Sequence, residues 1–76
     1  MPRYFFHIND GHEFPDNDGT VLDSVAAVHA QAIATAGAMI TENGGEVANG
    51  TEWHMTVADE TGHIVCDLHF LAHCPE

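Results

Sequence analysis

Basic side chains are almost absent from this sequence: it contains no lysine, and Arg3 is its single arginine. Twelve aspartate and glutamate side chains oppose that one cation, so the formal net charge at pH 7 is −11. Proteins that bind nucleic acid or anionic membrane surfaces draw on clustered lysine and arginine. The composition therefore argues against nucleic acid and membranes as partners.

Cysteine and long apolar runs are also scarce. Cys66 and Cys74 are the two cysteines, and the opening residues MPRYFFHIND lack the apolar segment and cleavage site of a secretory signal. No stretch approaches the roughly 18 to 20 apolar residues that span a bilayer. We therefore expect a reduced, cytoplasmic protein.

The chain is short, and its 76 residues are enough for one domain, with 71–76 expected to form a frayed tail. Its hydrophobic content of 45% is typical of a globular protein. A chain of this length buries only roughly 60% of the surface that it exposes when unfolded. Self-association would supplement such a thin core.

Three stretches alternate apolar and polar residues with the period of two that is typical of strands: 3–8, 51–58 and 63–70. Asp10-Gly11 indicates a tight hairpin and a short return strand at 12–14. The turn Asp59-Glu60-Thr61-Gly62 joins the last two strands. A short extended piece at 20–22 precedes a helical pattern.

Residues 25 to about 43 have that helical pattern, with Val25, Val28, Ala32, Ala36 and Met39 on one stripe and His29, Ile33 and Ile40 on its flank. Asp23 or Ser24 can cap its start, and Gly44-Gly45 would end it. The order β-β-α-β-β predicts an α+β fold, in which one long helix packs on one face of a mainly antiparallel sheet of three to four strands.

The same period of two assigns each strand residue to one side of the sheet. The side away from the helix would carry a mixed surface with several imidazoles, and Phe5 and Val65 would be its apolar points. The side under the helix would carry the core: Tyr4, Phe6, Ile8, Trp53, Met55, Val57, Ile64, Cys66, Leu68 and Phe70.

Small residues repeat every four positions along the predicted helix, at Ala26, Ala30, Ala34 and Ala38. A solvent-facing helix surface normally carries charged side chains, and a ridge of small residues lets a second helix approach closely. This pattern favours a homodimer formed through the helix. The alternative is that alanine is present only because it is the best helix former.

The seven histidines invite a chemical hypothesis, because neutral imidazole is a common ligand of Zn²⁺, Ni²⁺ and Cu²⁺. His7, His54 and His69 would converge if their strands were neighbours in suitable register, and Asp67 could add an oxygen ligand. The sequence contains no compact ligand motif such as CxxC or HExxH. The alternative is a set of scattered surface histidines.

Catalytic motifs are missing: Ser24 is expected to cap the helix and Cys66 to lie in the core, so no activated nucleophile can be named. No phosphate-binding loop is present either. We therefore predict a non-enzymatic protein without a required cofactor.

The opening Pro2-Arg3-Tyr4-Phe5-Phe6-His7, the later turn at 16–19 and the alanine-rich helix resemble a family of short bacterial proteins of unknown function. The resemblance covers most of the chain and implies a small cytoplasmic α+β domain. It brings no catalytic residue with it.

Taken together, these patterns predict a protein-interaction module that forms a homodimer or meets another protein through the helix or the sheet surface. The competing hypothesis is a metal-binding or metal-sensing domain that uses surface histidines to hold zinc or nickel.

Overall fold

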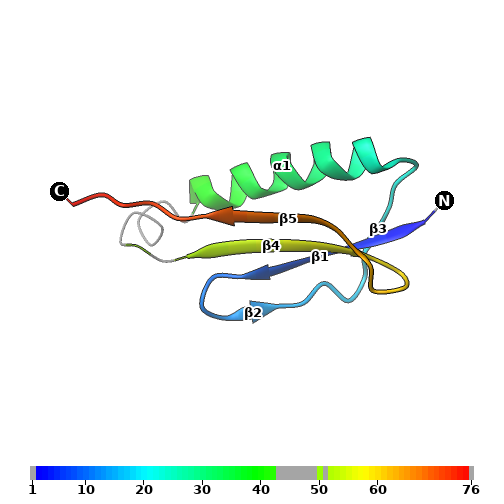
Figure 1. Cartoon of the computed structure of the whole chain (residues 1–76), viewed down its shortest axis with the longest axis horizontal. Helices are drawn as coiled ribbons and strands as arrows, with labels where there is room; N and C mark the ends of the chain where they lie inside the picture. The colour runs from blue at the N-terminus through cyan, green and yellow to red at the C-terminus, as the bar shows by residue number, and fades with distance from the viewer. Residues whose placement is uncertain (1, 43–49, 51, 76) are drawn as a thin grey trace.

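A computed structural model describes residues 2–42, 50 and 52–75 of the chain. Figure 1 shows one long helix above a sheet of strands. In chain order the elements are β1 (Arg3–Asn9), β2 (Glu13–Phe14), β3 (Thr20–Val21), α1 (Val25–Glu42), β4 (Trp53–Asp59) and β5 (Ile64–Phe70).

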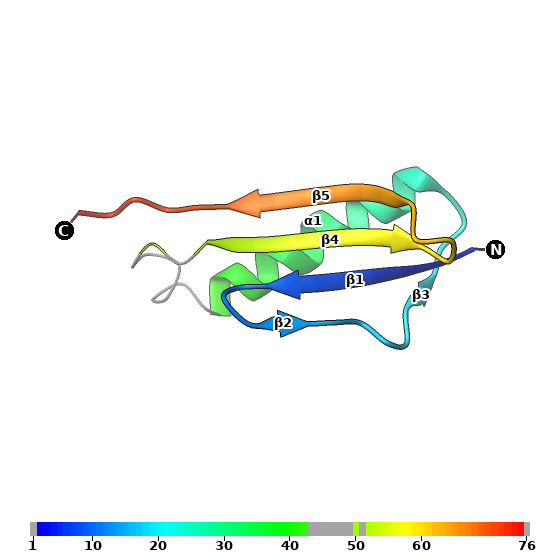
Figure 2. The same cartoon turned by 60° about the horizontal axis from the view of Figure 1, so that its bottom comes forward.

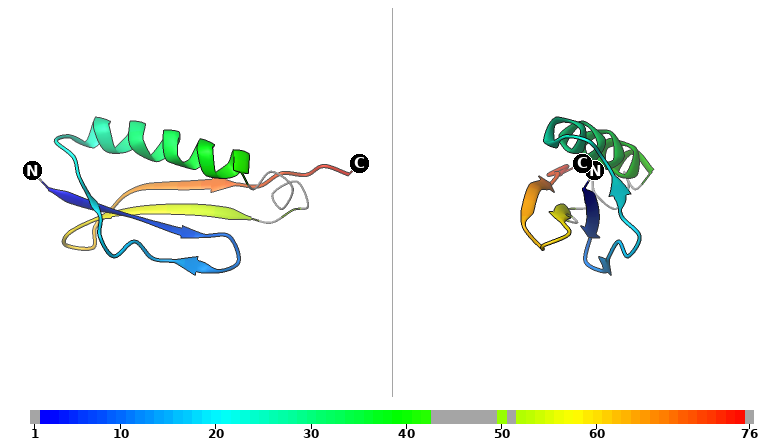
Figure 3. Two further views of the ribbon diagram at one scale, coloured as in Figure 1. Left: turned by 180° about the vertical axis from the view of Figure 1, so that it is seen from behind. Right: turned by 90° about the vertical axis from the view of Figure 1, so that its right-hand side faces the viewer.

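The strands form one antiparallel sheet in the order β2-β1-β4-β5, and β3 also pairs with β1. The helix covers one face of this sheet and leaves the other open, as the end-on view in Figure 3 shows. The predicted α+β fold is therefore confirmed. The extended piece expected at 20–22 is the additional strand, β3.

The helix begins as the sequence indicates. The Ser24 hydroxyl accepts a hydrogen bond from the backbone N–H of Ala27 at 3.1 Å, so Ser24 is the residue that caps α1. The expected helix end near Asn43 and its stop at Gly44-Gly45 lie outside the described residues, as does Thr51. Within the described part of the chain, no helix is long and apolar enough to cross a membrane.

The core lies between α1 and the middle of the sheet. Alternation along β4 buries Trp53, Met55 and Val57, and the spacing of four along α1 presents small side chains to them. The buried cluster is Tyr4, Val28, Ala32, Ala36, Trp53, Met55 and Val57, against which Phe6, Ile8, Cys66 and Leu68 pack while partly exposed. Most of the core predicted from the strands is thus in place. On the helix, however, Val25 of the predicted stripe is 49% exposed and Ile33 on its flank is 64% exposed.

A β-bulge changes which side of the sheet two residues of β5 face, compared with the alternation predicted from the sequence. Val57 pairs with Cys66, but the next residue of β4, Ala58, pairs with Ile64, so Val65 is one extra residue in β5. As a result Ile64 is 56% exposed, whereas Val65 packs against the buried cluster. The expectation that Val65 is an apolar point of the outer face, with Ile64 in the core, is therefore wrong.

Phe70 is a second departure from the predicted core, since it is 41% exposed. It pairs with the buried Trp53 and lies on the same side of the sheet. It is, however, the last residue of β5, which lies at the edge of the sheet (Figure 2) and has a neighbouring strand on one side alone. An edge position leaves even an inward side chain partly in solvent.

Candidate functional site

Polar side chains form cross-strand rows on the sheet face that α1 leaves open. Strand pairing aligns His7 with Thr56 and Thr56 with Asp67 in one row. It aligns Asn9 with His54 and His54 with His69 in the next row. Cross-strand partners point to the same side, so the register brings these polar groups together.

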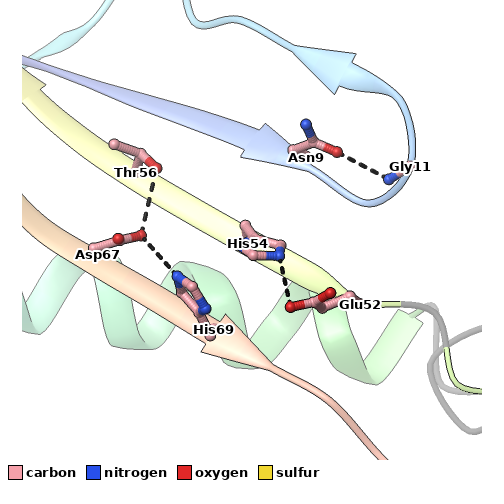
Figure 4. Close-up of polar contacts among 7 residues, drawn as sticks. All are labelled: Asn9, Gly11, Glu52, His54, Thr56, Asp67 and His69. Carbon is pink, nitrogen blue, oxygen red and sulfur yellow. Dashed lines mark hydrogen bonds and ion pairs between the residues drawn. The ribbon is translucent and has the colours of Figure 1, made fainter.

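His54 and His69 form the centre of a cluster near the start of β4 and the end of β5, away from the turn that joins these strands. Their ring centroids are 4.2 Å apart and their planes are tilted by 58°. Glu52 immediately precedes β4, and its Oε1 lies 3.2 Å from Nε2 of His54. One ligand atom from each of these three residues lies within 4.8 Å of the other two. We call this group the Glu52–His54–His69 cluster (Figure 4).

A further carboxylate adjoins the cluster on β5. Oδ1 of Asp67 lies 3.4 Å from Nε2 of His69 and accepts a hydrogen bond from the Thr56 hydroxyl at 3.5 Å. Figure 4 shows that each histidine has its own carboxylate partner. The four side chains are partly or largely exposed, so they remain accessible to an ion or ligand from solution.

Two open hollows lie beside the cluster. A hollow of about 400 Å³ is lined by Glu52 and His54 together with Asn9, Asp10, Gly11 and Thr56. A neighbouring hollow of about 290 Å³ is lined by His54, His7, Phe14 and other residues of the β1–β2 hairpin. Both are wide open to solvent.

His7, the third histidine of the predicted metal set, lies in a different network. Its Nδ1 accepts a hydrogen bond from the backbone N–H of Asp16 at 3.1 Å, and its ring stacks on Phe5 at 6.3 Å between centroids. His7 therefore shares the outer face with His54 and His69 but does not belong to the Glu52–His54–His69 cluster. Phe5 is half-buried beside it.

The Asp16 carboxylate occupies the interval between β2 and β3, where β1 has no strand on that side. Oδ2 accepts a hydrogen bond from the N–H of Phe6 at 3.1 Å, and Oδ1 accepts bonds from Asp18 and Gly19 at 3.1 and 3.0 Å. The bond from Gly19 contributes most to lowering the pKa of Asp16, with those from Phe6 and Asp18 adding to it and burial opposing them. This network supports the edge of the sheet.

The outer surface of α1 carries the four predicted interface alanines. Ala26, Ala30, Ala34 and Ala38 are all exposed. Ile33 lies among them with 64% of its surface exposed, and a Cβ added to Gly37 would meet nothing within 4 Å. Before Glu42 the helix contains no charged side chain. We call this surface the α1 outer face.

One member of the cluster was missing from the predicted metal set. Glu52 carries a usable signal, because it is two residues before His54 and so lies on the same side of an extended chain. The pairing of His54 with His69 depends on the register between β4 and β5, which includes the bulge at Val65. Local alternation alone does not specify that register.

A family model described as a domain of unknown function (DUF6894) matches residues 3–71 of the chain. The matched segment contains β1 through β5, the cluster and the α1 outer face. No curated protein and no solved structure matches the chain.

Proposed function

We propose that this chain, which belongs to the family defined by the domain of unknown function DUF6894, is a non-enzymatic protein-interaction module that forms a homodimer through the α1 outer face. The observation that carries the proposal is the uncharged, small-residue surface of α1 with Ile33 exposed at its centre. A helix surface normally exposed to water is rich in charged side chains.

The geometry of this surface suits a second copy of the same chain. Alanines spaced by four form a low ridge, which packs into the matching groove of an identical helix at close approach. A two-fold interface is self-complementary, so one patch is sufficient. The acidic residues lie outside this patch, and their mutual repulsion is therefore not concentrated at the contact.

The shallow core supports the same proposal. Seven large hydrophobic residues of the described chain are exposed: Phe14, Val21, Val25, Ile33, Ile64, Phe70 and Leu71. Small domains bury a modest share of their surface and gain stability from association. The free edge of β5, with Ile64 and Phe70, offers a second surface for a protein partner.

The exposure of the polar side chains supports the proposal that the protein is not an enzyme. Catalytic acids and bases commonly lie in enclosed sites that shift their pKa values strongly. Apart from the aromatic Tyr4 and Trp53, no side chain with a polar group is buried within the described residues, and both hollows beside the histidines are open.

Cellular context belongs to the proposal too. A cytoplasmic location is supported by Cys66 and Cys74, which are free thiols in the structure. A bacterial source is supported by the resemblance carried by residues 2–7.

The dimer is tested by light scattering and sedimentation from low to high micromolar concentration, against a monomer mass of 8.2 kDa. Ala30→Glu would place a charge at the centre of the contact, and we expect dissociation to become at least about tenfold easier because a buried unpaired charge is costly. His12→Glu is the matched control, since it gives the same net charge at a side chain 86% exposed in the β1–β2 turn.

Salt separates general repulsion from the specific contact. Because two copies carry −11 each, added salt should strengthen association of the wild type and of His12→Glu alike. Salt should not restore Ala30→Glu. A wild type that is monomeric at every concentration, or equal effects of the two variants, would remove the homodimer proposal.

A further inference from the structure

We infer that Glu52, His54 and His69 form a binding site for a divalent transition-metal ion of the zinc, nickel and copper group. The site lies on the open sheet face, opposite the α1 outer face, and is independent of the proposed dimer. It differs from the set expected from sequence, because Glu52 replaces His7 as the third ligand.

The spacing of the ligand atoms supports this inference. Bonds of about 2.0 to 2.1 Å hold two ligands of one tetrahedral ion about 3.3 Å apart. Oε1 of Glu52 and Nε2 of His54 are already 3.2 Å apart, and all three ligand atoms lie within 4.8 Å of one another. The His54 and Glu52 side chains are 31% and 57% exposed, so neither is locked in place by burial while the remaining distance closes.

The backbone beneath the cluster is fixed by strand pairing. His54 and His69 are direct cross-strand partners in β4 and β5, so their Cα atoms are held in register by the sheet. Figure 4 shows both rings and the Glu52 carboxylate gathered above the ends of these strands. A metal ion bound there would connect the two strands and resist their separation.

Asp67 adds a feature that metal-binding histidines usually have. A ligating imidazole commonly donates its other ring N–H to a carboxylate, which fixes the orientation of the ring. Oδ1 of Asp67 lies 3.4 Å from Nε2 of His69, which leaves Nδ1 of that ring for the ion. Thr56 in turn donates a hydrogen bond to the same oxygen at 3.5 Å. Asp67 is thus a positioning residue for His69.

The electrostatic setting favours a cation. The chain carries −11, and its one arginine, Arg3, begins β1, whereas Asn9 at the other end of β1 pairs with His54. At about 3.3 Å per residue, roughly 20 Å of strand separate the arginine from the cluster. Two nitrogens and one carboxylate select zinc, nickel or copper over calcium and magnesium, which prefer oxygen ligands.

Three protein ligands leave at least one coordination position for water or a small ligand. Glu52 and His54 line the hollow of about 400 Å³, so such a ligand has room to reach the ion. The arrangement is therefore an open site whose ion can exchange with solution, which suits sensing or carrying an ion.

Calorimetric titration of the full chain with ZnCl₂ and with NiCl₂ tests the inference, and the cobalt absorption spectrum reports coordination by nitrogen and oxygen. We expect one ion per chain. His54→Gln and His69→Gln should each weaken binding by at least about tenfold, since even loss of an outer carboxylate partner commonly reduces affinity 10- to 100-fold. Glu52→Gln should also weaken binding, and Asp67→Asn should do so less.

Two histidine variants outside the cluster are the controls. His12→Gln and His7→Gln should leave the zinc affinity and the cobalt spectrum unchanged, and His7→Gln in particular separates this site from the His7–His54–His69 set. Circular dichroism in EDTA checks that every variant is folded. Binding that is absent in the wild type, unaffected by His54→Gln, or weakened equally by all histidine variants would overturn the inference.

Discussion

His7 and His54 lie one cross-strand row apart on the same sheet face, yet their surroundings differ in kind. Nδ1 of His7 is occupied by the backbone N–H of Asp16, whose carboxylate in turn accepts three backbone hydrogen bonds. Among the residues that the structure describes, the polar partners of His54 and His69 are the exposed side chains of Glu52 and Asp67. The first network is closed and supports the fold, whereas the second is open and can exchange its partners for a ligand.

The difference follows from the sheet. β1 lacks a neighbouring strand between β2 and β3, so backbone groups there need a substitute acceptor, and Asp16 supplies it. The cluster lies above the part of β4 and β5 that is paired without interruption, from Trp53 with Phe70 to Val57 with Cys66, so its side chains have no such structural task. Side chains that are not needed to stabilise the fold are the better candidates for binding a ligand.

The largest effect is expected from breaking the closed network at its centre. Asp16→Asn should lower the free energy of unfolding by about 2 kcal/mol at pH 7, because hydrogen bonds to a charged acceptor contribute about 1.5 to 3 kcal/mol. Urea denaturation measures the change. Asp18→Asn is the control, since it removes the same charge two residues away, and Asp18 contributes its backbone N–H to this network.

The pH dependence of the stability of Asp16→Asn should show that the loss comes from the charge of the Asp16 carboxylate. The pKa of Asp16 is lowered in the folded protein from the ordinary value of 3.8 by the backbone hydrogen bond from Gly19 and its companions. The stabilisation is therefore complete above that value and disappears as the pH falls through the lower folded-state pKa. The gap between wild type and Asp16→Asn should be constant near neutrality and close below pH 3.8; a gap that persists in acid would contradict this account.

A smaller loss is expected at Gly19, where the same loop meets β1. Its φ is +73°, and an added Cβ would lie 2.8 Å from Cγ of Arg3 and 3.0 Å from Phe5. Gly19→Ala should reduce stability by about 1 to 2 kcal/mol, through the left-handed backbone and the close contact together. Thermal or urea unfolding gives the value.

A double-mutant cycle with Arg3→Ala measures how much of that loss comes from the contact with Arg3. Truncating Arg3 removes the nearest atom of the contact but leaves the backbone conformation as it is. Gly19→Ala should therefore cost less in the Arg3→Ala background. An identical cost in both backgrounds would show that the contact with Arg3 contributes nothing, and that the backbone conformation and the contact with Phe5 account for the loss.

The two networks also differ in how far sequence could predict them. Alternation along the strands correctly places Tyr4, Trp53 and Met55 in the core, because the side of a strand residue depends on local geometry. The helix and both hairpins follow equally from local patterns. Residues 16–19 are recognisable in the sequence as a turn. Their support of β1, however, depends on the stretch of β1 that has no partner strand between β2 and β3.

The reversal at Ile64 and Val65 has a similar reason. A bulge is a property of two strands in register, and nothing in the alternation of residues 63–70 alone requires one. The cluster depends on both local alternation and strand pairing. His54 and Glu52 share a side by local alternation, whereas His69 joins them only through the pairing of β4 with β5. The expectation that His7 would join did not take account of Asp16, which is nine residues away along the chain.

The smallest effects distinguish the two histidine environments directly. In EDTA, His7→Ala should lower the free energy of unfolding by about 1 kcal/mol, since the Asp16 N–H loses its acceptor. His54→Gln and His69→Gln should change it by less than about 0.5 kcal/mol, because exposed side-chain pairs contribute little to stability. Urea denaturation in parallel on the three variants measures these differences.

The outcome bears on function because a stability role and a ligand role make opposite demands on a histidine. If His54→Gln destabilised the metal-free protein as much as His7→Ala, the cluster would be a second structural network, and its exposed position would need another explanation. If His54 and His69 are dispensable for folding but required for zinc affinity, the sheet face retains them for the ion. The contrast with His7, on the same face and one row away, then shows that strand pairing, not residue type, decides which histidine is free to bind.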